Sequence, residues 1–280
     1  MTSISGKTAF VTGAASGLGR AMAHDFAKRG ANVMLADLNA DGLATVKSEI
    51  EALGAQADTV VCDVADLNAI KAAAKATTDR FCKVHIVVNN AGVAIGGQPG
   101  EIATEDWRWI VDINLLGVAY GVEVFTPLIA SHGEGGHFIN TASMAGHVAA
   151  PGMGPYNATK YAVVGYSEAL KQELEPRKIG VSVLCPAWVK TNIHNTGFAK
   201  PSGGPTQEEA ASDPHYQQMS AVIESGIDAG LVASWVSDCV EANRLYIFTH
   251  PQFAGFIDMK YAQIKADYDA AAKDGRFEGV

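Results

Sequence analysis

The chain has 280 residues, of which 48% are hydrophobic and 18% are charged, and its formal net charge is −9. This composition provides enough apolar residues for a sizeable core and excludes an intrinsically disordered chain. The negative charge and the lack of a Lys/Arg run argue against a nucleic-acid partner. The apolar runs are too short to span a membrane, and the N-terminus lacks the apolar segment of a signal peptide, so we expect a cytoplasmic protein with no membrane partner.

The cysteines and histidines show no pattern of a metal site. The eight histidines include no H-E-x-x-H or similar pair, and the four cysteines include no C-x-x-C. Widely spaced cysteines are typical of small core residues in a reducing compartment, and a metal or disulfide site is the less favoured interpretation. We therefore expect no bound metal. The cysteines are Cys62, Cys82, Cys185 and Cys239.

Short β-branched runs alternate with longer amphipathic runs, which predicts βαβ crossovers and a parallel sheet with helices on both faces. Because such crossovers are right-handed, the α/β fold should be doubly wound. No linker divides the chain, so residues 1–280 should form a single domain. The predicted strands are Thr8–Val11, Asn32–Ala36, Asp58–Cys62, Ile86–Asn89, His137–Asn140, Val181–Cys185 and Leu245–Phe248. The predicted helices are Leu18–Arg29, Ala40–Leu53, Leu67–Phe81, Thr104–Ile129, Tyr156–Glu175 and Ile227–Asn243.

A glycine-rich turn follows the first predicted strand and opens the first predicted helix. It runs from Thr12 to Gly19 as T-G-x-x-x-G-x-G. Glycines let the backbone approach a pyrophosphate, and the free N–H groups of a helix N-terminus favour its charge. The turn therefore indicates a dinucleotide phosphate site, with a plain strand–helix turn as the alternative. The candidate phosphate contacts are Gly13, Ser16, Gly17, Leu18 and Gly19.

Asp37 ends the second predicted strand. A carboxylate there can accept hydrogen bonds from the ribose hydroxyls of an adenine nucleotide, and it would repel a 2′-phosphate. The turn contains no Arg or Lys, and the residues directly after Asp37 are Leu38 and Asn39. The sequence therefore favours NAD over NADP, with a solvated turn carboxylate as the alternative.

Polar and small residues also follow the third and fourth predicted strands. Asp63 could bond an adenine amino group while Val64 packs beside it, although an aspartate after a strand is also ordinary turn chemistry. The N-N-A-G run at Asn89–Gly92 places small residues at the carboxyl edge of the sheet, where such sheets bind ligands. A plain turn is the alternative. The candidate cofactor contacts in this run are Asn90, Ala91 and Gly92.

The strongest catalytic signal is Tyr-x-x-x-Lys at Tyr156 and Lys160, which share one helix face. A nearby ammonium lowers the pKa of a phenol, so Tyr156 would act as an acid or base near neutral pH. The pattern also arises by chance in helices. Ser143, just past a predicted strand, could hold a substrate oxygen opposite the tyrosine. Asn114 stands among apolar neighbours and needs a partner, either as a core amide or as the holder of a relay water.

Two segments interrupt the alternation of strands and helices. Asn195–Pro214 is rich in Gly, Pro, Ser and Thr, and its length favours a substrate lid at about residues 192–225 over a disordered insertion. The C-terminal extension, at about residues 251–280, has the spacing of a partly amphipathic helix. This helix would cover a pocket, pack on a neighbouring subunit or lie on its own domain. Its apolar residues are Phe256, Met259, Tyr261, Ile264 and Tyr268.

Together these motifs resemble the short-chain dehydrogenase/reductase family over roughly residues 4–250. The resemblance implies a Rossmann-type domain with a seven-stranded parallel sheet, which transfers a hydride between NAD and a small-molecule substrate. It also implies a homodimer or homotetramer. The matching pieces, in chain order, are the T-G-x-x-x-G-x-G turn, Asp37, Asp63, N-N-A-G, Asn114, Ser143 and Y-x-x-x-K.

The resemblance assigns a role to each member of a catalytic tetrad. Tyr156 is the acid/base, and Ser143 polarises the carbonyl or alcohol. Lys160 binds the nicotinamide ribose and lowers the pKa of the tyrosine. Asn114 holds a relay water.

The run Pro186–Thr191 is similar to the P-G-x-V-x-T segment of the family, which lies against the nicotinamide. By this match, Val189 and Thr191 contact its carboxamide. Ala187 replaces the usual glycine, and alanine is unfavourable there only if φ is positive.

Substrate recognition is expected from residues that follow the catalytic elements. Many of them are apolar or aromatic, which favours a bulky aromatic secondary alcohol or its ketone. The lid, the tail and the Ser143–Gly146 turn are similar to those of bacterial Cα-dehydrogenases of lignin-derived aryl ethers. The alternatives are a steroid, terpene or simple aryl alcohol dehydrogenase and a non-catalytic NAD(H)-binding regulator; a nucleotide-sugar epimerase or dehydratase is disfavoured by the compact C-terminal part. The candidate substrate contacts are Ile95, Ser143, His147, Tyr156 and Trp188.

Overall fold

The computed structural model describes residues 3–277, and within them seven strands form one sheet. The strands are β1 (Thr8–Thr12), β2 (Asn32–Asp37), β3 (Ala57–Val61), β4 (Ile86–Asn89), β5 (Gly136–Thr141), β6 (Ile179–Cys185) and β7 (Tyr246–Phe248). Their order is β3-β2-β1-β4-β5-β6-β7, and each neighbouring pair is parallel. This confirms the expected seven-stranded, doubly wound parallel sheet.

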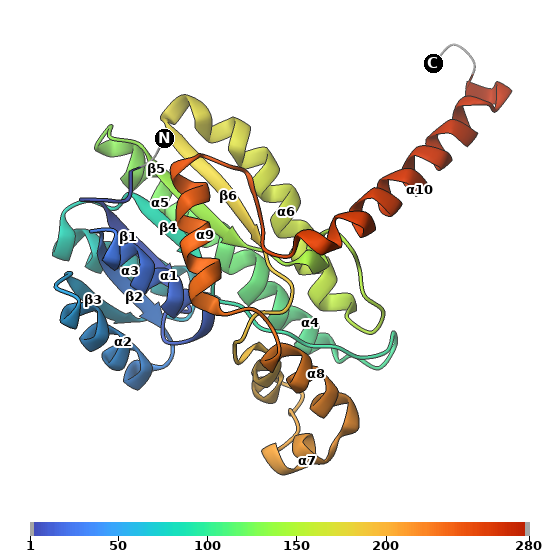
Figure 1. Ribbon diagram of the computed structural model, residues 1–280, viewed down its shortest axis with the longest axis horizontal. Helices are drawn as coiled ribbons and strands as arrows, with labels where there is room; N and C mark the ends of the chain where they lie inside the picture. The colour runs from blue at the N-terminus through green and yellow to red at the C-terminus, as the bar shows by residue number, and fades with distance from the viewer. Residues whose placement is uncertain (1–2, 278–280) are drawn as a thin grey trace.

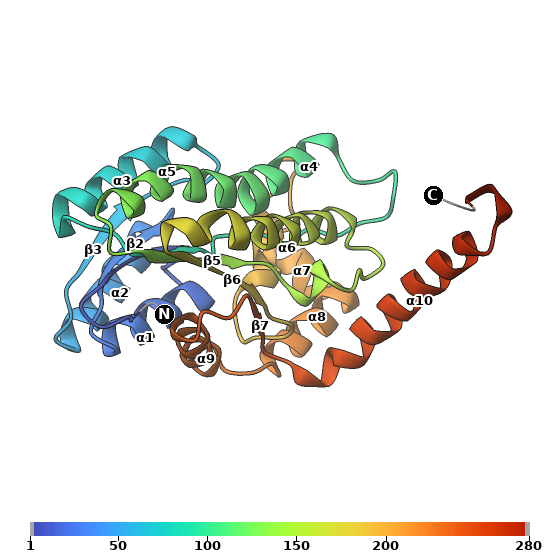
Figure 2. The same cartoon turned by 90° about the horizontal axis from the view of Figure 1, so that it is seen from above.

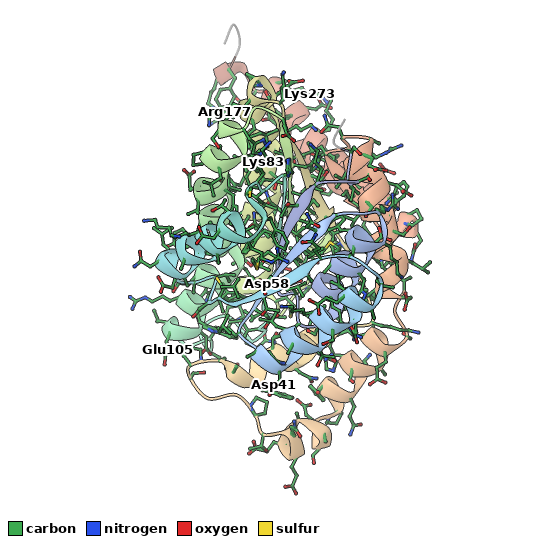
Figure 3. The ribbon with its side chains drawn as sticks, turned by 90° about the vertical axis from the view of Figure 1, so that its left-hand side faces the viewer. Asp41, Asp58, Lys83, Glu105, Arg177 and Lys273 are labelled. Carbon is green, nitrogen blue, oxygen red and sulfur yellow. The ribbon has the colours of Figure 1, made fainter. Side chains whose placement is uncertain are left out.

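The helices lie on both sides of the sheet. They are α1 (Gly17–Lys28), α2 (Ala40–Ala52), α3 (Leu67–Phe81), α4 (Thr104–Val111), α5 (Gly117–Ser131), α6 (Gly154–Leu174), α7 (Gln207–Ser212), α8 (Pro214–Glu224), α9 (Ala229–Glu241) and α10 (Ala254–Ala272). Helices α1, α2 and α9 cover one face, and α3, α5 and α6 cover the other (Figure 1, Figure 2). Charged side chains such as Asp41 and Glu105 lie on the outside (Figure 3).

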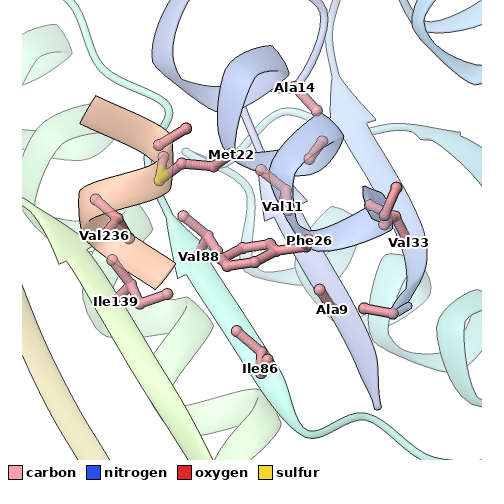
Figure 4. Close-up of a cluster of buried hydrophobic side chains, with 14 of the residues drawn as sticks. Ala9, Val11, Ala14, Met22, Phe26, Val33, Ile86, Val88, Ile139 and Val236 are labelled. Atoms are coloured by element: carbon pink, nitrogen blue, oxygen red, sulfur yellow. The ribbon is translucent and has the colours of Figure 1, made fainter. Parts of the chain in front are cut away.

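A hydrophobic core lies on each face of the sheet. Phe26 of α1 packs over the central strands beside Val11 and Val88, and Val236 of α9 extends the same cluster (Figure 4). Because helices cover both faces, every residue of β1, β4 and β5 is buried. This rigid centre fixes the carboxyl ends of the strands, where the candidate site residues lie.

The predicted helix Thr104–Ile129 is one helical segment that runs through α4 and α5, with a π-helical turn at Asp112–Leu116 between them. Such turns occur often at functional sites, and this one contains Asn114. The segment Thr104–Ser131 is long and apolar enough to cross a membrane by composition. Its apolar side packs Phe125 and Ile129 into the core, so it is a core helix.

Two expectations about the rest of the chain need correction. Asn195–Pro214 is not an irregular loop, because it contains most of a 3-10 helix at Ile193–Ala199 and all of α7. Helix α7 begins with a capping box in which the Thr206 hydroxyl accepts the N–H of Glu209 at 3.2 Å and the Glu209 carboxylate accepts the N–H of Thr206 at 2.8 Å. Among the cysteines, Cys82 is exposed rather than in the core.

Candidate active site

The strand order reverses at β1, which pairs with β2 on one side and β4 on the other. In open parallel sheets the ligand crevice lies at the carboxyl ends of the strands beside such a reversal. Thr12 joins the two walls of this crevice. Its hydroxyl accepts the N–H groups of Asn90 at 2.9 Å and Ala91 at 3.0 Å, and its carbonyl accepts the Asn90 amide at 3.0 Å. The glycine turn and the N-N-A-G run are therefore adjacent.

The glycine turn has a backbone that larger residues would not tolerate. Gly13 and Gly17 have φ angles of +65° and +53°, and a Cβ on Gly19 would lie 2.1 Å from the Gly13 carbonyl oxygen. Within the described residues, the Ser16 hydroxyl makes no capping hydrogen bond and the first turn of α1 has no acidic residue. This helix N-terminus therefore suits an anion such as a pyrophosphate. Gly17 and Leu18 begin α1 there.

Asp37 lies at the end of β2 and is tied to the glycine turn. One carboxylate oxygen accepts the N–H of Ala15 at 3.0 Å, and the other accepts the N–H of Asn39 at 3.0 Å. The carboxylate stays half-exposed. It is thus fixed beside the anion-binding turn, where it suits a ribose diol.

The residues after β3 have different surroundings. Asp63 is exposed and accepts the N–H of Ala65 at 3.0 Å, as in an ordinary turn. Val64 is buried against α5, where a Cβ on Gly117 would come within 3.0 Å of its side chain. A contact between either residue and an adenine ring remains a prediction.

Ser143, Tyr156 and Lys160 come together at the ends of β5 and α6. Ser143 lies close enough to the Tyr156 side chain to lower its pKa. The Ser143 hydroxyl donates a hydrogen bond to the Pro186 carbonyl at 3.3 Å. The Lys160 ammonium lies 5.6 Å from the ring centroid of Tyr156. It donates a hydrogen bond to the Thr141 carbonyl at 2.9 Å. The structure therefore assembles the three residues as the sequence led us to expect.

Burial controls the protonation of this group. It raises the pKa of Tyr156, and the nearby Ser143 opposes that shift without reversing it. Burial also lowers the pKa of Lys160 to about 8. The Lys160 ammonium is held by the Thr141 carbonyl, and a lowering of the Tyr156 pKa by Lys160 stays a prediction.

Asn114 lies beside the group, and its side chain is bonded to protein on both ends. Its carbonyl oxygen accepts the N–H of Val93 at 2.8 Å, and its amide donates to the Val93 carbonyl at 2.8 Å and to the Thr159 hydroxyl at 3.3 Å. A Cβ on Gly92 would lie 3.2 Å from Asn114 Oδ1 and 3.6 Å from Lys160 Nζ. The side chain is thus a satisfied core amide that positions the residues after β4, and its relay water stays a prediction.

The segment after β6 closes the other side of the crevice. A Cβ on Gly17 would lie 3.2 Å from the Thr191 methyl group, so this segment contacts the glycine turn. Val189 is buried, and the Pro186 carbonyl holds Ser143. The segments that carry the predicted phosphate, ribose and nicotinamide contacts are thus neighbours at the carboxyl edge of the sheet.

Comparison with known proteins gives the family. Residues 7–201 match the family described as short chain dehydrogenase. The chain belongs to this family. It is 32% identical over 272 residues to the "CLA biosynthesis dehydrogenase/reductase" of Lactiplantibacillus plantarum. The aligned residues cover 93% of this chain and 94% of the relative. The chain is also 32% identical over 247 residues to the "C alpha-dehydrogenase" of a Sphingobium strain, covering 88% of this chain and 81% of that one.

A solved short chain dehydrogenase/reductase from Burkholderia phymatum, in complex with NAD, has a similar structure. It is 36% identical, covers 95% of this chain and 97% of its own, and superimposes with a TM-score of 0.89. The family resemblance and the fold expected from the sequence are therefore confirmed.

Ala187 is accommodated without strain in this short chain dehydrogenase. The described non-glycine residues with positive φ are Cys82, Lys178 and Asn243, so Ala187 lies outside the strained region. Alanine thus occupies this position without backbone strain.

The predicted substrate contacts differ in their surroundings. Ile95 is buried and Trp188 is 42% exposed, and their contact with a substrate stays a prediction. His147 is buried instead against Cys185, with its Nε2 at 3.3 Å from the thiol, and against the ring of Phe248. These contacts favour a packing role for His147.

Sequence reasoning missed the residues that hold the segment between β6 and α7. The Thr196 hydroxyl accepts the N–H of Ala94 at 2.9 Å, and Asp106 of α4 binds Ser202 and Lys200. Asp106 is buried, and an acidic residue on the apolar face of a helix is the signal that could have identified it.

One cluster outside the crevice has the composition of a metal site. Ligand atoms of His85, His132 and Glu134 lie within 4.8 Å of one another. Glu134 is already paired with Lys7 at 2.8 Å and with Lys83. Two ammonium groups on the shared carboxylate do not suit a cation.

Proposed function

We propose that this short chain dehydrogenase interconverts a bulky aromatic secondary alcohol and its ketone with NAD as cofactor. The observation that supports the reaction best is the grouping of Ser143, Tyr156 and Lys160 at the carboxyl edge of the sheet, with the Lys160 ammonium 5.6 Å from the Tyr156 ring centroid. A protein that only binds NAD(H) as a regulator has no need of a serine, a tyrosine and a lysine brought together in this way. Steroid and terpene alcohols are the alternative substrates.

NAD fits the residues of the crevice. The N-terminus of α1 suits the pyrophosphate, Asp37 suits the ribose diol and disfavours a 2′-phosphate, and Thr191 lies where the nicotinamide is expected. When bound, the nicotinamide supplies the hydride chemistry. The similar Burkholderia phymatum enzyme was solved with NAD.

The protein residues move the proton. Ser143 holds the substrate oxygen, and the Tyr156 hydroxyl gives a proton to it in reduction or takes one in oxidation. Because burial raises the pKa of Tyr156, the phenol is protonated at neutral pH and ready for ketone reduction. Oxidation requires the phenolate, so its rate should increase with pH.

A bulky apolar substrate is supported by a depression at the start of α6, the helix that carries Tyr156. A depression of about 390 Å³ is lined almost entirely by apolar groups, including Ile102, Trp107, Pro151 and Gly154. Gly154 and Tyr156 both lie in the first turn of α6. The similarity to the Sphingobium Cα-dehydrogenase favours a lignin-derived aryl alcohol.

The setting of the enzyme follows from the same reasoning. Residues 1–280 form a single catalytic domain whose lid, at about residues 192–225, covers the substrate. The enzyme works in the cytoplasm as a homodimer or homotetramer, without nucleic-acid or membrane partners.

The deciding experiment measures NADH formation from NAD with benzylic, steroidal and aliphatic secondary alcohols, and NADH consumption with the matching ketones. Tyr156→Phe should abolish turnover while NADH binding is retained. Tyr166→Phe on the same helix is the matched control and should remain active. Turnover confined to benzylic alcohols supports the substrate class. NADH binding without turnover of any substrate would favour the regulator.

A further inference from the structure

Helix α10 projects from the body in both views (Figure 1, Figure 2). Each of its 19 residues is exposed or half-buried. Tyr261 and Tyr268 are 60% and 72% exposed, and Ile264 is 39% exposed. A single helix of this length is only marginally stable in water, because helices in proteins are stabilised mainly by packing of an apolar face. The exposed apolar residues of α10 therefore need a partner.

The spacing of its apolar residues indicates another helix as that partner. Ile257, Tyr261, Ile264 and Tyr268 follow one another at intervals of four, three and four residues. This is the alternation of the a and d positions of a coiled coil, which places all four on one stripe. We call these four residues the α10 stripe.

Charged residues flank the α10 stripe on both sides. Asp258 and Lys265 occupy the e positions, and Lys260 and Asp267 occupy the g positions. In a parallel pair, the g residue of one helix faces the following e residue of the other, which would place Lys260 opposite Lys265. In an antiparallel pair, e faces e and g faces g, so Asp258 faces Lys265 and Lys260 faces Asp267. The charges therefore favour the antiparallel arrangement.

We propose that α10 forms an antiparallel coiled coil with α10 of a second copy of this chain. In this register Tyr261 packs against Ile264 of the second copy, and Ile257 packs against its Tyr268. The pairing is isologous, so each contact occurs twice about a two-fold axis.

The root of α10 is fixed to the body, which makes the helix a defined arm. The Lys260 ammonium donates to the His147 carbonyl at 3.0 Å and to the Tyr161 hydroxyl at 3.3 Å, and it lies 4.5 Å from the Tyr161 ring centroid. Beyond Lys260, no hydrogen bond or ion pair joins the arm to the body in the described residues, although Tyr261 lies near enough to Tyr246 of β7 to raise the pKa of Tyr246. Because the Lys260 ammonium is engaged by the body, the antiparallel register depends on the pair Asp258–Lys265, in which Lys265 also pairs with Asp269 of its own helix.

Disulfide cross-linking tests the register directly, in a Cys82→Ser background that removes the exposed thiol. Residues 257 and 268 lie about 16 Å apart along one helix, too far for a bond within a chain. The double variant Ile257→Cys/Tyr268→Cys should give a covalent dimer under mild oxidation. Either single variant should give little, because identical positions do not meet in the antiparallel pair. Equal cross-linking of a single variant, or none of the double variant, would overturn the proposal.

A second measurement tests the apolar contact and the charges. In the double-cysteine variant, Ile264→Asp should reduce cross-linking about tenfold, whereas Ala266→Asp, which adds the same charge away from the stripe, should not. Lys265→Glu should also weaken cross-linking, and adding Asp258→Lys should restore it. An unchanged yield with Ile264→Asp would show that something other than a second α10 covers the stripe.

Discussion

The Asp106 carboxylate accepts two hydrogen bonds from Ser202, one from its backbone N–H at 3.0 Å and one from its hydroxyl at 2.6 Å. Asp106 is only 2% exposed, and the Lys200 ammonium lies 3.5 Å away. Burial alone would raise the pKa of Asp106, but the bonds from Ser202 and the charge of Lys200 hold it below its usual value. A buried charge on α4 thus anchors the segment between β6 and α7.

Replacing Asp106 by Asn should loosen this segment. The amide cannot accept both bonds from Ser202, and losing such bonds to a buried charged group weakens the attachment by about 1–3 kcal/mol. We expect faster proteolysis between residues 200 and 206 and a higher KM, with a smaller change in kcat. Glu105→Gln, an exposed neighbour, is the control. Equal proteolysis of both variants would contradict this anchor.

The attachment of Ser202 to Asp106 should persist at neutral pH and be lost only in acid. The pKa of Asp106 is lower in the folded state than in the unfolded chain. The charged carboxylate therefore contributes its full stabilisation at any pH above the usual pKa of an aspartate, and this contribution is lost as the pH falls through the lowered pKa. Proteolysis of the wild type should therefore accelerate in acid, whereas the Asp106→Asn variant should show a weaker pH dependence.

Asp37→Asn should change the choice of cofactor. The asparagine keeps an oxygen for the Ala15 N–H but removes the charge that repels a 2′-phosphate. We expect NADPH to gain about tenfold in affinity relative to NADH, since one like-charge repulsion is removed. Fluorescence titration with both nucleotides measures this ratio, and an unchanged ratio would refute the role of Asp37.

The charge of Lys160 should control nucleotide binding near pH 8. Its pKa is lowered by burial to about 8, so the ammonium is present below that pH and neutral above it. If the ammonium holds the nicotinamide ribose, NADH affinity should fall about three- to tenfold as pH rises from 7 to 9. The Lys160→Met variant should bind NADH weakly at both pH values. A flat wild-type profile would show that the charge does not contribute.

Gly121→Ala should destabilise the fold. A Cβ at this position in α5 would lie 2.0 Å from Asn89 Oδ1 in the sheet, and such overpacking costs about 1–3 kcal/mol. Gly165→Ala in α6 is the matched control, because its Cβ would meet none of the described atoms within 4 Å. It should stabilise the helix by about 0.5–1 kcal/mol. Urea unfolding of both variants measures the difference.

Local sequence patterns were sufficient to predict the strands of the sheet and the positions of most candidate site residues. The bounds of β4 agree at both ends with the predicted strand Ile86–Asn89, because its buried apolar run ends abruptly at polar residues. Ser143, Tyr156 and Lys160 meet as expected. Ser143 follows β5 directly, and Tyr156 and Lys160 share one face of α6. Their separation along the chain is fixed by regular elements, which sequence patterns describe well.

Contacts between distant irregular segments were not predictable in this way. Asp106 and Ser202 are 96 positions apart, and neither residue alone indicates the other. His147 follows Ser143 closely, yet a 3-10 turn at Met144–Gly146 directs it to Cys185. The start of α7 was missed although its T-x-x-E capping pattern is visible in the sequence, because the surrounding Gly and Pro residues suggested a loop.

The bonds from Thr12 to Asn90 and Ala91 have a consequence for affinity. They join the phosphate-binding turn to the opposite wall of the crevice, together with the donation of the Thr12 hydroxyl to the Val88 carbonyl at 3.1 Å. Thr12 therefore fixes the positions of the two segments relative to each other. The conformational entropy of bringing them together is lost when the chain folds, so a nucleotide that enters later meets a preorganised cleft and loses less of its binding free energy to ordering the protein.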